Sequence, residues 1–329
     1  MAQSDVHWAD EAEAIKSNKP LKLLLFLFKT LPAFIIHAMC FPATFFFLIF
    51  SPHARKDART YQKQLWEFSG GKIPPKISGY RQLLSFSLCL LEKIEGWLGK
   101  VKFTRIHYAD DDVQELLERL RDGKGAILIT SHLGNMELLR SLQDYNTQLC
   151  GREVPVVIIM DMKISEQFSQ TLKELNPHYS MNVVESTSIG PDSMIYLEEQ
   201  AERGALIVVA GDRTSAQNRD KVIKKTFLGK EACFPYGVFL IPFLMKMPVY
   251  YMFGMRSHFS IFKPKYNVYI EKSLVDCDCP RSERGERISQ MCGEFVLKLE
   301  KFCMMYPYQW YNFFNFWKQD NHVEGDGNA

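Results

Sequence analysis

Short apolar runs alternate with amphipathic segments over most of the chain, starting at about residue 101. The run at 156–160 is apolar at every position, which is typical of a strand covered on both faces. The segment at 192–203 instead carries apolar side chains at helical spacing. This alternation predicts an α/β fold with a mainly parallel central sheet flanked by helices.

The same patterns place the individual elements. Strands are predicted at 101–107, 126–131, 156–160, 181–185, 205–210, 248–253 and 266–270. Helices are predicted at 84–98, 112–120, 136–142, 165–175, 192–203 and 288–303. The helix at 84–98 is amphipathic, so it could either lie on a membrane or pack on the main domain.

The N-terminal part contains a long apolar stretch. No Lys, Arg, Asp or Glu occurs between Lys29 and Arg55, and residues 31–50 are long enough to cross a bilayer as a helix. Pro42 would kink or end that helix, so a kinked span and a re-entrant hairpin both fit, and a pair of buried core helices is the alternative without a membrane. Basic residues flank the stretch on both sides and therefore assign neither side to the cytoplasm. A secretory signal is disfavoured, since no small-residue cleavage site follows.

We therefore expect three regions in this chain of 329 residues. An N-terminal region at 1–65 would hold a membrane-anchoring segment at about 21–50, an α/β domain would cover 66–317, and 318–329 would be a polar tail. The 40 Lys and Arg nearly balance the 38 Asp and Glu, which gives no reason to expect a nucleic-acid partner. The eight cysteines form no CxxC pair, and no dinucleotide or P-loop motif occurs, so we expect neither a metal nor a cofactor.

A histidine and a carboxylate lie five positions apart where a predicted strand gives way to a predicted helix. His132 follows an uncharged strand, at the end where open α/β sheets bind ligands, and Glu137 could orient its imidazole to accept a proton from a hydroxyl. The same spacing occurs at His107 and Asp112, where the strand is half exposed and Asp112 has a sufficient role at a helix N-terminus. We therefore favour His132 and Glu137; a core histidine beside a helix-start glutamate is the purely structural alternative.

The octapeptide Ser-His-Leu-Gly-Asn-Met-Glu-Leu at 131–138 resembles the first motif of the bacterial lipid A late acyltransferases, in the lysophospholipid acyltransferase superfamily. Later motifs of that family are similar, in the same order, to the segments at 204–213, 227–237, 247–249 and 307–310. Met136 departs from the usual Trp. The Gly-Asp-Arg sequence at 211–213, with the proline-broken apolar segment, is more similar to relatives found with aryl polyene pathways.

The resemblance implies a glycerol-3-phosphate acyltransferase-like fold at the bacterial inner membrane, with the active site on the cytoplasmic side. The implied reaction moves a fatty or aryl polyene-type acyl chain from a thioester on acyl carrier protein or coenzyme A to a hydroxyl of a membrane lipid or lipid-linked acceptor. His132 would be the base and Glu137 its orienter, while Arg213 or backbone amides near Gly134 would bind the oxyanion. Asp212 would hold Arg213 or a loop of the site. The expected substrate contacts are Gly134, Asn135, Asp212, Arg213, Phe227, Gly229 and Lys230.

A local basic cluster follows the Gly-Asp-Arg segment and could attract an acidic carrier protein or a lipid phosphate, although a solvated loop face explains it equally well. Its members are Arg219, Lys221, Lys224, Lys225 and Lys230. No GxSxG elbow occurs, so direct transfer is preferred to a covalent acyl-enzyme. Two rivals fit the sequence: a glycosyltransferase acting on a lipid carrier, with Asp276-Cys277-Asp278 as a metal-binding motif, and an inactive membrane scaffold of the same fold.

Overall fold

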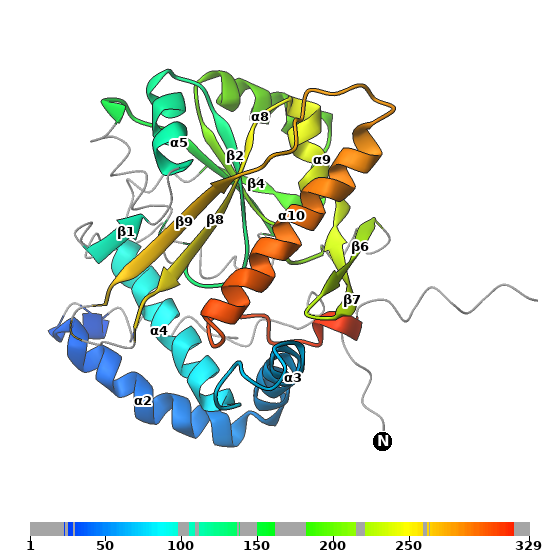
Figure 1. Cartoon of the computed structure of the whole chain (residues 1–329). Helices are drawn as coiled ribbons and strands as arrows, with labels where there is room; N and C mark the ends of the chain where they lie inside the picture. The colour runs from blue at the N-terminus through cyan, green and yellow to red at the C-terminus, as the bar shows by residue number, and fades with distance from the viewer. Residues whose placement is uncertain are drawn as a thin grey trace, which may run out of the picture.

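A computed structural model shows an α/β protein built on one seven-stranded sheet with helices on both faces (Figure 1). The structure describes residues 23, 26–28, 30–97, 105–108, 112–136, 138, 150–161, 182–214, 221–258, 262 and 264–318. The strand order is β1 (Ile106–Tyr108), β9 (Tyr266–Lys272), β8 (Val249–Arg256), β2 (Ala126–Thr130), β5 (Leu206–Ala210), β3 (Val156–Met160), β4 (Asn182–Glu185). Only β8 and β9 pair antiparallel; the other neighbouring strands pair parallel. The predicted fold class, a mainly parallel sheet flanked by helices, is confirmed.

The core has two apolar layers, one on each face of the sheet, because side chains of the central strands alternate between the two faces. In β2, Ile127 and Ile129 face one layer, while Ala126 and Leu128 face the other, because successive side chains of a strand point to opposite faces. Every residue of β2 is buried, as expected of a central parallel strand covered on both sides.

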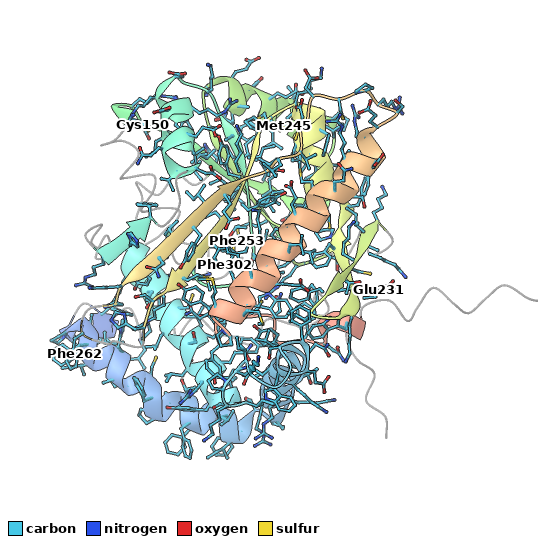
Figure 2. All side chains as sticks on the ribbon, viewed as in Figure 1. Cys150, Glu231, Met245, Phe253, Phe262 and Phe302 are labelled. Atoms are coloured by element: carbon cyan, nitrogen blue, oxygen red, sulfur yellow. The ribbon has the colours of Figure 1, made fainter. Side chains whose placement is uncertain are left out.

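Helices on each face of the sheet complete these two layers. The helix α5 (Asp112–Arg121) covers one face, and α9 (Tyr236–Met245) and α10 (Arg284–Met305) cover the other. Figure 2 shows one contact of the second layer, where the ring of Phe302 on α10 lies 4.5 Å, centroid to centroid, from the ring of Phe253 on β8. The last predicted helix and the predicted strands at 126–131, 156–160 and 205–210 are all confirmed.

Apart from two short 3-10 helices, four described elements were not predicted. They are α3 (Pro52–Phe68), α9, and the hairpin of β6 (Val222–Phe227) and β7 (Lys230–Pro235). The helix α8 (Pro191–Glu202) and strand β4 were predicted. Residues 101–104, the helix predicted at 165–175 and most of the helix predicted at 136–142 lie outside the described residues.

The N-terminal apolar stretch forms α2 (Ala33–Phe50), which continues through Pro42, so that proline does not end the helix. By length and composition α2 is the one described helix that could cross a membrane, and few of its residues are buried. It packs on α4 (Gly79–Trp97), which confirms the helix predicted at 84–98. The domain boundary predicted at residue 65 falls within α3, whose Leu65 belongs to the main core. Of the predicted tail, residues 319–329 lie outside the described part.

Candidate active site

His132 is held by the carboxylate of Asp212. The two residues follow neighbouring strands, since Thr130 of β2 pairs with Ala210 of β5, and the carboxyl ends of parallel strands lie at the same edge of the sheet. The imidazole Nδ1 lies 2.8 Å from Asp212 Oδ1. The backbone N–H of His132 also donates to both carboxylate oxygens, at 2.9 and 3.1 Å. The sheet thereby joins two residues that are 80 positions apart in the chain.

Two further side chains donate to the same carboxylate. Trp310 Nε1 and Asn312 Nδ2 each lie 3.0 Å from Asp212 Oδ2. Asp212 is fully buried, and burial alone would raise the pKa of its carboxyl group. The charges of His132 and Arg213, together with these hydrogen bonds, outweigh burial and hold that pKa below its ordinary value. Asp212 is therefore an ionised acceptor for His132.

The segment that carries Trp310 is joined to the His132 loop by backbone hydrogen bonds. Gly134 N–H donates to Gln309 O at 2.8 Å, and Tyr311 N–H donates to His132 O at 2.9 Å. The Gln309 side chain bonds both backbone groups of Arg256 on β8, at 2.9 and 2.8 Å. The loop after β2 is consequently fixed between β8 and the chain near its C-terminal end.

Gly134 is required by close packing. Its φ is +78°, a conformation that favours glycine, and a Cβ there would lie 2.1 Å from the Gly254 carbonyl oxygen. Gly134 is buried, and the neighbouring Asn135 donates its backbone N–H to Gly254 O at 2.7 Å. Their roles as substrate contacts stay predictions, whereas their structural role is evident.

These bonds bear on the expected oxyanion donors. The backbone N–H groups of Gly134 and Asn135 are engaged within the protein, and that of Leu133 donates to Ser131 Oγ at 3.2 Å. Of the two candidates expected to bind an oxyanion, the amides of residues 133–135 are engaged within the protein, whereas Arg213 contributes a cation. Both roles stay predictions.

Arg213 is positioned by the same C-terminal segment. Its Nε donates to Asn312 Oδ1 at 2.7 Å, and its Nη2 donates to Tyr311 O at 3.1 Å. Asn312 thus links Arg213 to Asp212, using its oxygen for one residue and its nitrogen for the other. Asn312 carried no sequence signal, because it lies beyond the terminal motif that ends at Trp310.

The environment of His132 favours the neutral imidazole. Burial lowers its pKa, the Arg213 guanidinium lowers it further, and the Asp212 carboxylate opposes both without reversing the shift. The side chain keeps 28% of its surface exposed. Among the described residues no group hydrogen-bonds Nε2. A neutral imidazole with a fixed Nδ1 and an accessible Nε2 is suited to accept a proton.

Glu137 lies outside the described residues, as does Arg219. The predicted role of Glu137 as orienter of His132 therefore stays a prediction. The carboxylate seen to engage the imidazole Nδ1 is Asp212, which the sequence had assigned to Arg213 or a loop.

The predicted Phe-Gly loop is the turn of the β6–β7 hairpin. Leu228 and Gly229 both have positive φ, 49° and 79°, as in the tight turns that join two twisted strands. Phe227 is fully buried, with its ring 5.3 Å from that of Trp310, so it supports the residue that holds Asp212. Lys230 is exposed at the start of β7. Phe227 thus lies in the core, and the substrate roles of these residues stay predictions.

The helix α4 packs beside the site. Its Cys89 Sγ lies 3.7 Å from Gly134 O, and the ring of Phe86 lies 5.4 Å from that of Tyr311. The apolar helix α2 packs on α4, where Phe28, Ile36, Leu91 and Ile94 form a separate apolar cluster. The site is therefore close to the most apolar helix of the protein.

The other His-acid pair is not brought together. His107 is exposed on β1, and Asp112 Oδ2 accepts the backbone N–H of Lys272 at 2.7 Å. Within the described part of the chain no hydrogen bond or ion pair joins His107 to Asp112. This arrangement agrees with the structural role inferred for Asp112.

The carboxylates of Asp276 and Asp278 lie in the loop between β9 and α10, at the end of the sheet opposite to His132 (Figure 1). Asp278 Oδ1 lies 2.8 Å from Lys246 Nζ, and Asp276 Oδ1 accepts the backbone N–H of Asp278 at 2.9 Å. Among the described residues no group of three or more metal-ligating side chains occurs.

Comparison with known proteins adds no relative: no protein-family model and no curated protein sequence matches this chain. Function is therefore inferred from the geometry of the site.

Proposed function

We propose that this chain is a membrane-associated acyltransferase that moves an acyl group from a thioester to a hydroxyl of a lipid or lipid-linked acceptor. The observation that carries the proposal is the fixed imidazole of His132. Asp212 holds its Nδ1 at 2.8 Å, so the proton of the neutral ring resides on Nδ1 and Nε2 is the basic nitrogen. The motifs that resemble the lipid A late acyltransferases favour the same reaction.

The reaction balances with His132 as the only base. Nε2 accepts the proton of the acceptor hydroxyl while its oxygen attacks the thioester carbonyl carbon, forming a C–O bond. The tetrahedral intermediate then collapses, the C–S bond breaks, and the imidazolium returns the proton to the departing thiolate. Asp212 stabilises the transient imidazolium, as a carboxylate does in a catalytic triad. An ester and a free thiol result.

Arg213 would stabilise the negative charge of the intermediate. Its guanidinium is half-buried, it lowers the pKa of His132, and two of its nitrogens are fixed by Asn312 and Tyr311. A preorganised cation near developing charge needs little rearrangement during the reaction. The thioester donor would be carried by acyl carrier protein or coenzyme A, and no bound cofactor is needed.

The membrane component rests on α2. The rings of Phe46, Phe47 and Phe50 are exposed on it, although exposed aromatic clusters are rare on soluble monomers. His37 of α2 and Glu95 of α4 are both buried, with His37 Nε2 3.1 Å from Glu95 Oε1, although the geometry is not that of a hydrogen bond. A helix that left α4 to span the bilayer would place the polar His37 side chain in lipid, which is costly. We infer that α2 lies along the membrane surface, at the bacterial inner membrane and with the site on the cytoplasmic side.

The test is acyl transfer by purified protein in detergent. Labelled acyl carrier protein or acyl coenzyme A is incubated with a membrane lipid extract and with wild type, His132→Ala or His107→Ala. We expect His132→Ala to lose transfer by about 10²- to 10⁴-fold, since that is the usual contribution of a general base. His107→Ala is the matched control and should retain transfer, because its side chain is exposed and unpaired with Asp112. Full transfer by His132→Ala would refute the mechanism.

The same assay separates the two rivals. Metal-dependent transfer of a sugar to a lipid carrier would favour a glycosyltransferase, although Lys246 already pairs with one of the two carboxylates that would hold the metal. Absence of both activities together with intact membrane binding would favour an inactive scaffold.

A further inference from the structure

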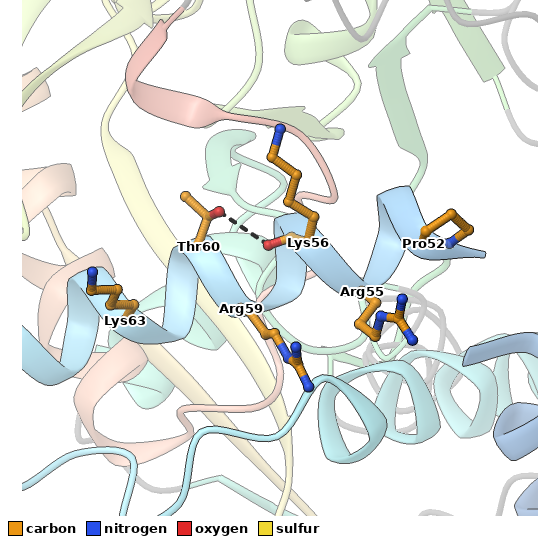
Figure 3. Close-up of a pocket in the computed structure, with 6 residues that line it drawn as sticks. All are labelled: Pro52, Arg55, Lys56, Arg59, Thr60 and Lys63. Atoms are coloured by element: carbon orange, nitrogen blue, oxygen red, sulfur yellow. Dashed lines mark hydrogen bonds between the residues drawn. The ribbon is translucent and has the colours of Figure 1, made fainter. Parts of the chain in front are cut away.

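A row of cations follows one face of α3. The basic stripe, as we name it, consists of Arg55, Lys56, Arg59 and Lys63, spaced so that they lie on one side of the helix. Together with Pro52 and Thr60 these side chains line a hollow of about 370 Å³ (Figure 3). The opposite face of α3 is buried through Ala58 and Leu65, so the stripe has a fixed orientation on the protein.

Acidic side chains of the protein neutralise these cations only weakly. Lys56, Arg59 and Lys63 are exposed and Arg55 is partly exposed. Lys63 lies 3.7 Å from Glu67, in a pair whose side chains are 71% and 45% exposed, a geometry that contributes little attraction. Across the described residues, Arg55, Lys56 and Arg59 form no ion pair. The hollow is therefore ready to accept an anion.

The stripe begins where the apolar surface of α2 ends. Phe50, the last residue of α2, is 79% exposed, and only Ser51 separates it from α3. The helices α2 and α3 lie at the same end of the molecule (Figure 1), and Trp66 is exposed near the far end of α3. An apolar surface bordered by Lys, Arg and Trp is typical of elements that lie at the boundary between lipid tails and headgroups.

We propose that the basic stripe binds the phosphate groups of anionic membrane lipids. The proposal rests on the membrane association inferred above and adds a chemical preference to it. Two guanidinium groups offer paired N–H donors that match phosphate oxygens, and two ammonium groups offer point charges. The Thr60 hydroxyl already donates to Lys56 O at 3.0 Å, a bond drawn in Figure 3, so the cations provide the attraction.

The position of the stripe favours lipid over an acidic carrier protein. A protein partner would need free access to α3, but an α2 embedded beside it would bring α3 against the headgroups. The other basic cluster offers an acidic carrier protein a separate binding surface. Its described members lie on the β6–β7 hairpin or next to it and are Lys221, Lys224, Lys225 and Lys230.

Vesicle binding tests the proposal with the full chain. Binding is measured on phosphatidylcholine vesicles with and without phosphatidylglycerol. The stripe variant carries Arg55→Gln, Lys56→Gln, Arg59→Gln and Lys63→Gln. A control variant removes the same charge at the opposite end of the sheet through Lys124→Gln, Arg203→Gln, Lys246→Gln and Arg281→Gln.

Wild type should prefer the anionic vesicles, and added salt should weaken that preference. Each cation near an anionic surface contributes about a five-fold gain, so the loss of four should weaken binding of the stripe variant to anionic vesicles by about 600-fold relative to wild type. The control variant should bind as wild type does, and binding to pure phosphatidylcholine should change little.

Equal weakening of both variants, or full binding by the stripe variant, would overturn the proposal. So would a stripe variant that loses affinity for acyl carrier protein but keeps its affinity for vesicles. Failure of the proposed function would look different, because it concerns His132. In detergent the stripe variant should retain acyl transfer, which His132→Ala should lose whether or not the stripe binds lipid.

Discussion

The smallest unit of the candidate site is one imidazole and the carboxylate that selects its tautomer. Asp212 accepts hydrogen bonds from His132 Nδ1 and backbone N–H, from Trp310 and from Asn312. The donors other than the imidazole fix the orientation of the Asp212 carboxylate, so Asp212 can accept from His132 in one geometry. Because Asp212 is charged and can only accept, it keeps the ring proton on Nδ1 and leaves Nε2 unprotonated.

Asp212→Asn should remove catalysis while leaving the fold. The asparagine oxygen can keep the bonds from Trp310 and Asn312, which turns its NH₂ group toward the imidazole. Nδ1 must then accept, so the ring proton moves to Nε2 and the base is blocked. We expect a fall in kcat of about 10²- to 10⁴-fold. The measurement is steady-state acyl transfer, with circular dichroism and thermal unfolding to confirm that the variant is folded. Unchanged kcat in a folded variant would contradict the assigned role.

Arg213 should help to set the pH below which His132 is protonated and can no longer act as a base. Burial and the Arg213 charge hold the His132 pKa below its ordinary value of 6.5, so the neutral base persists at lower pH and the acidic limb of kcat/KM should lie below 6.5. Arg213→Gln removes the second cause but leaves Asp212, so the pKa rises and the limb moves to higher pH. Profiles of kcat/KM against pH measure the shift. A limb that stays in place, or moves to lower pH, would exclude this electrostatic coupling.

At the scale of elements, sequence patterns predicted much of the sheet but not how the site is assembled. Strands β2, β3 and β5 are short apolar runs with clear limits, and their positions were predicted nearly to the residue. Asp212 was placed near the site by a motif, yet its bond to His132 depends on β5 being the neighbour of β2. Strand order is decided by the packing of all helices and strands, and no local pattern records it.

The elements that were missed lack a local pattern for a different reason. The helix α3 is mostly polar, and the few apolar residues that bury it, such as Tyr61 and Leu65, are recognisable only once the core they enter is known. The β6–β7 hairpin carries lysines on its exposed side and resembles a loop in sequence. Its turn is stabilised from elsewhere, because Gln64 of α3 donates to Leu228 O at 2.7 Å.

The contact between α4 and β8 includes a buried ion pair, which should be sensitive to the loss of one partner. Arg256 and Glu92 pair through Nη1 and Oε1, with side chains only 6% and 2% exposed. Glu92→Leu removes the carboxylate that pairs with this buried guanidinium and should lower the free energy of unfolding by about 3–5 kcal/mol. Replacing both, as Glu92→Leu with Arg256→Met, should cost less than the single change, because neither charge of the pair remains.

Denaturant unfolding of the detergent-solubilised protein measures both variants. Glu67→Leu is the control, since it breaks the exposed pair with Lys63 and should cost no more than about 1 kcal/mol. A double variant as unstable as Glu92→Leu would mean that packing around Glu92, and not its ion pair with Arg256, determines the stability of this contact.

At the scale of the whole molecule, the apolar helix α2 and the candidate site belong to one continuous stack. The helix α2 packs on α4, and α4 contacts the His132 loop through Cys89. All three helices α2, α3 and α4 lie at the carboxyl end of the central strands, where His132 and Asp212 are found (Figure 1). Under the proposed function, a lipid acceptor would reach His132 from the side that carries α2, without crossing the sheet.

If α2 holds this side against lipid, its exposed rings should determine membrane retention. Burying a large apolar side chain contributes about 1.5–3 kcal/mol, and these rings are already partly covered by protein, so the triple variant Phe46→Ser, Phe47→Ser and Phe50→Ser should reduce partitioning into vesicles on the order of 10²-fold. The control variant Leu244→Ser, Leu274→Ser and Leu297→Ser removes exposed side chains that lie outside α2 and should stay bound. Flotation on phosphatidylcholine vesicles measures the difference without contributions from the basic stripe. Transfer to a detergent-dispersed acceptor should survive in both variants, because α2 would act by seating the protein and not by touching the reacting atoms. Retention of the triple variant on vesicles would show that another surface makes the membrane contact.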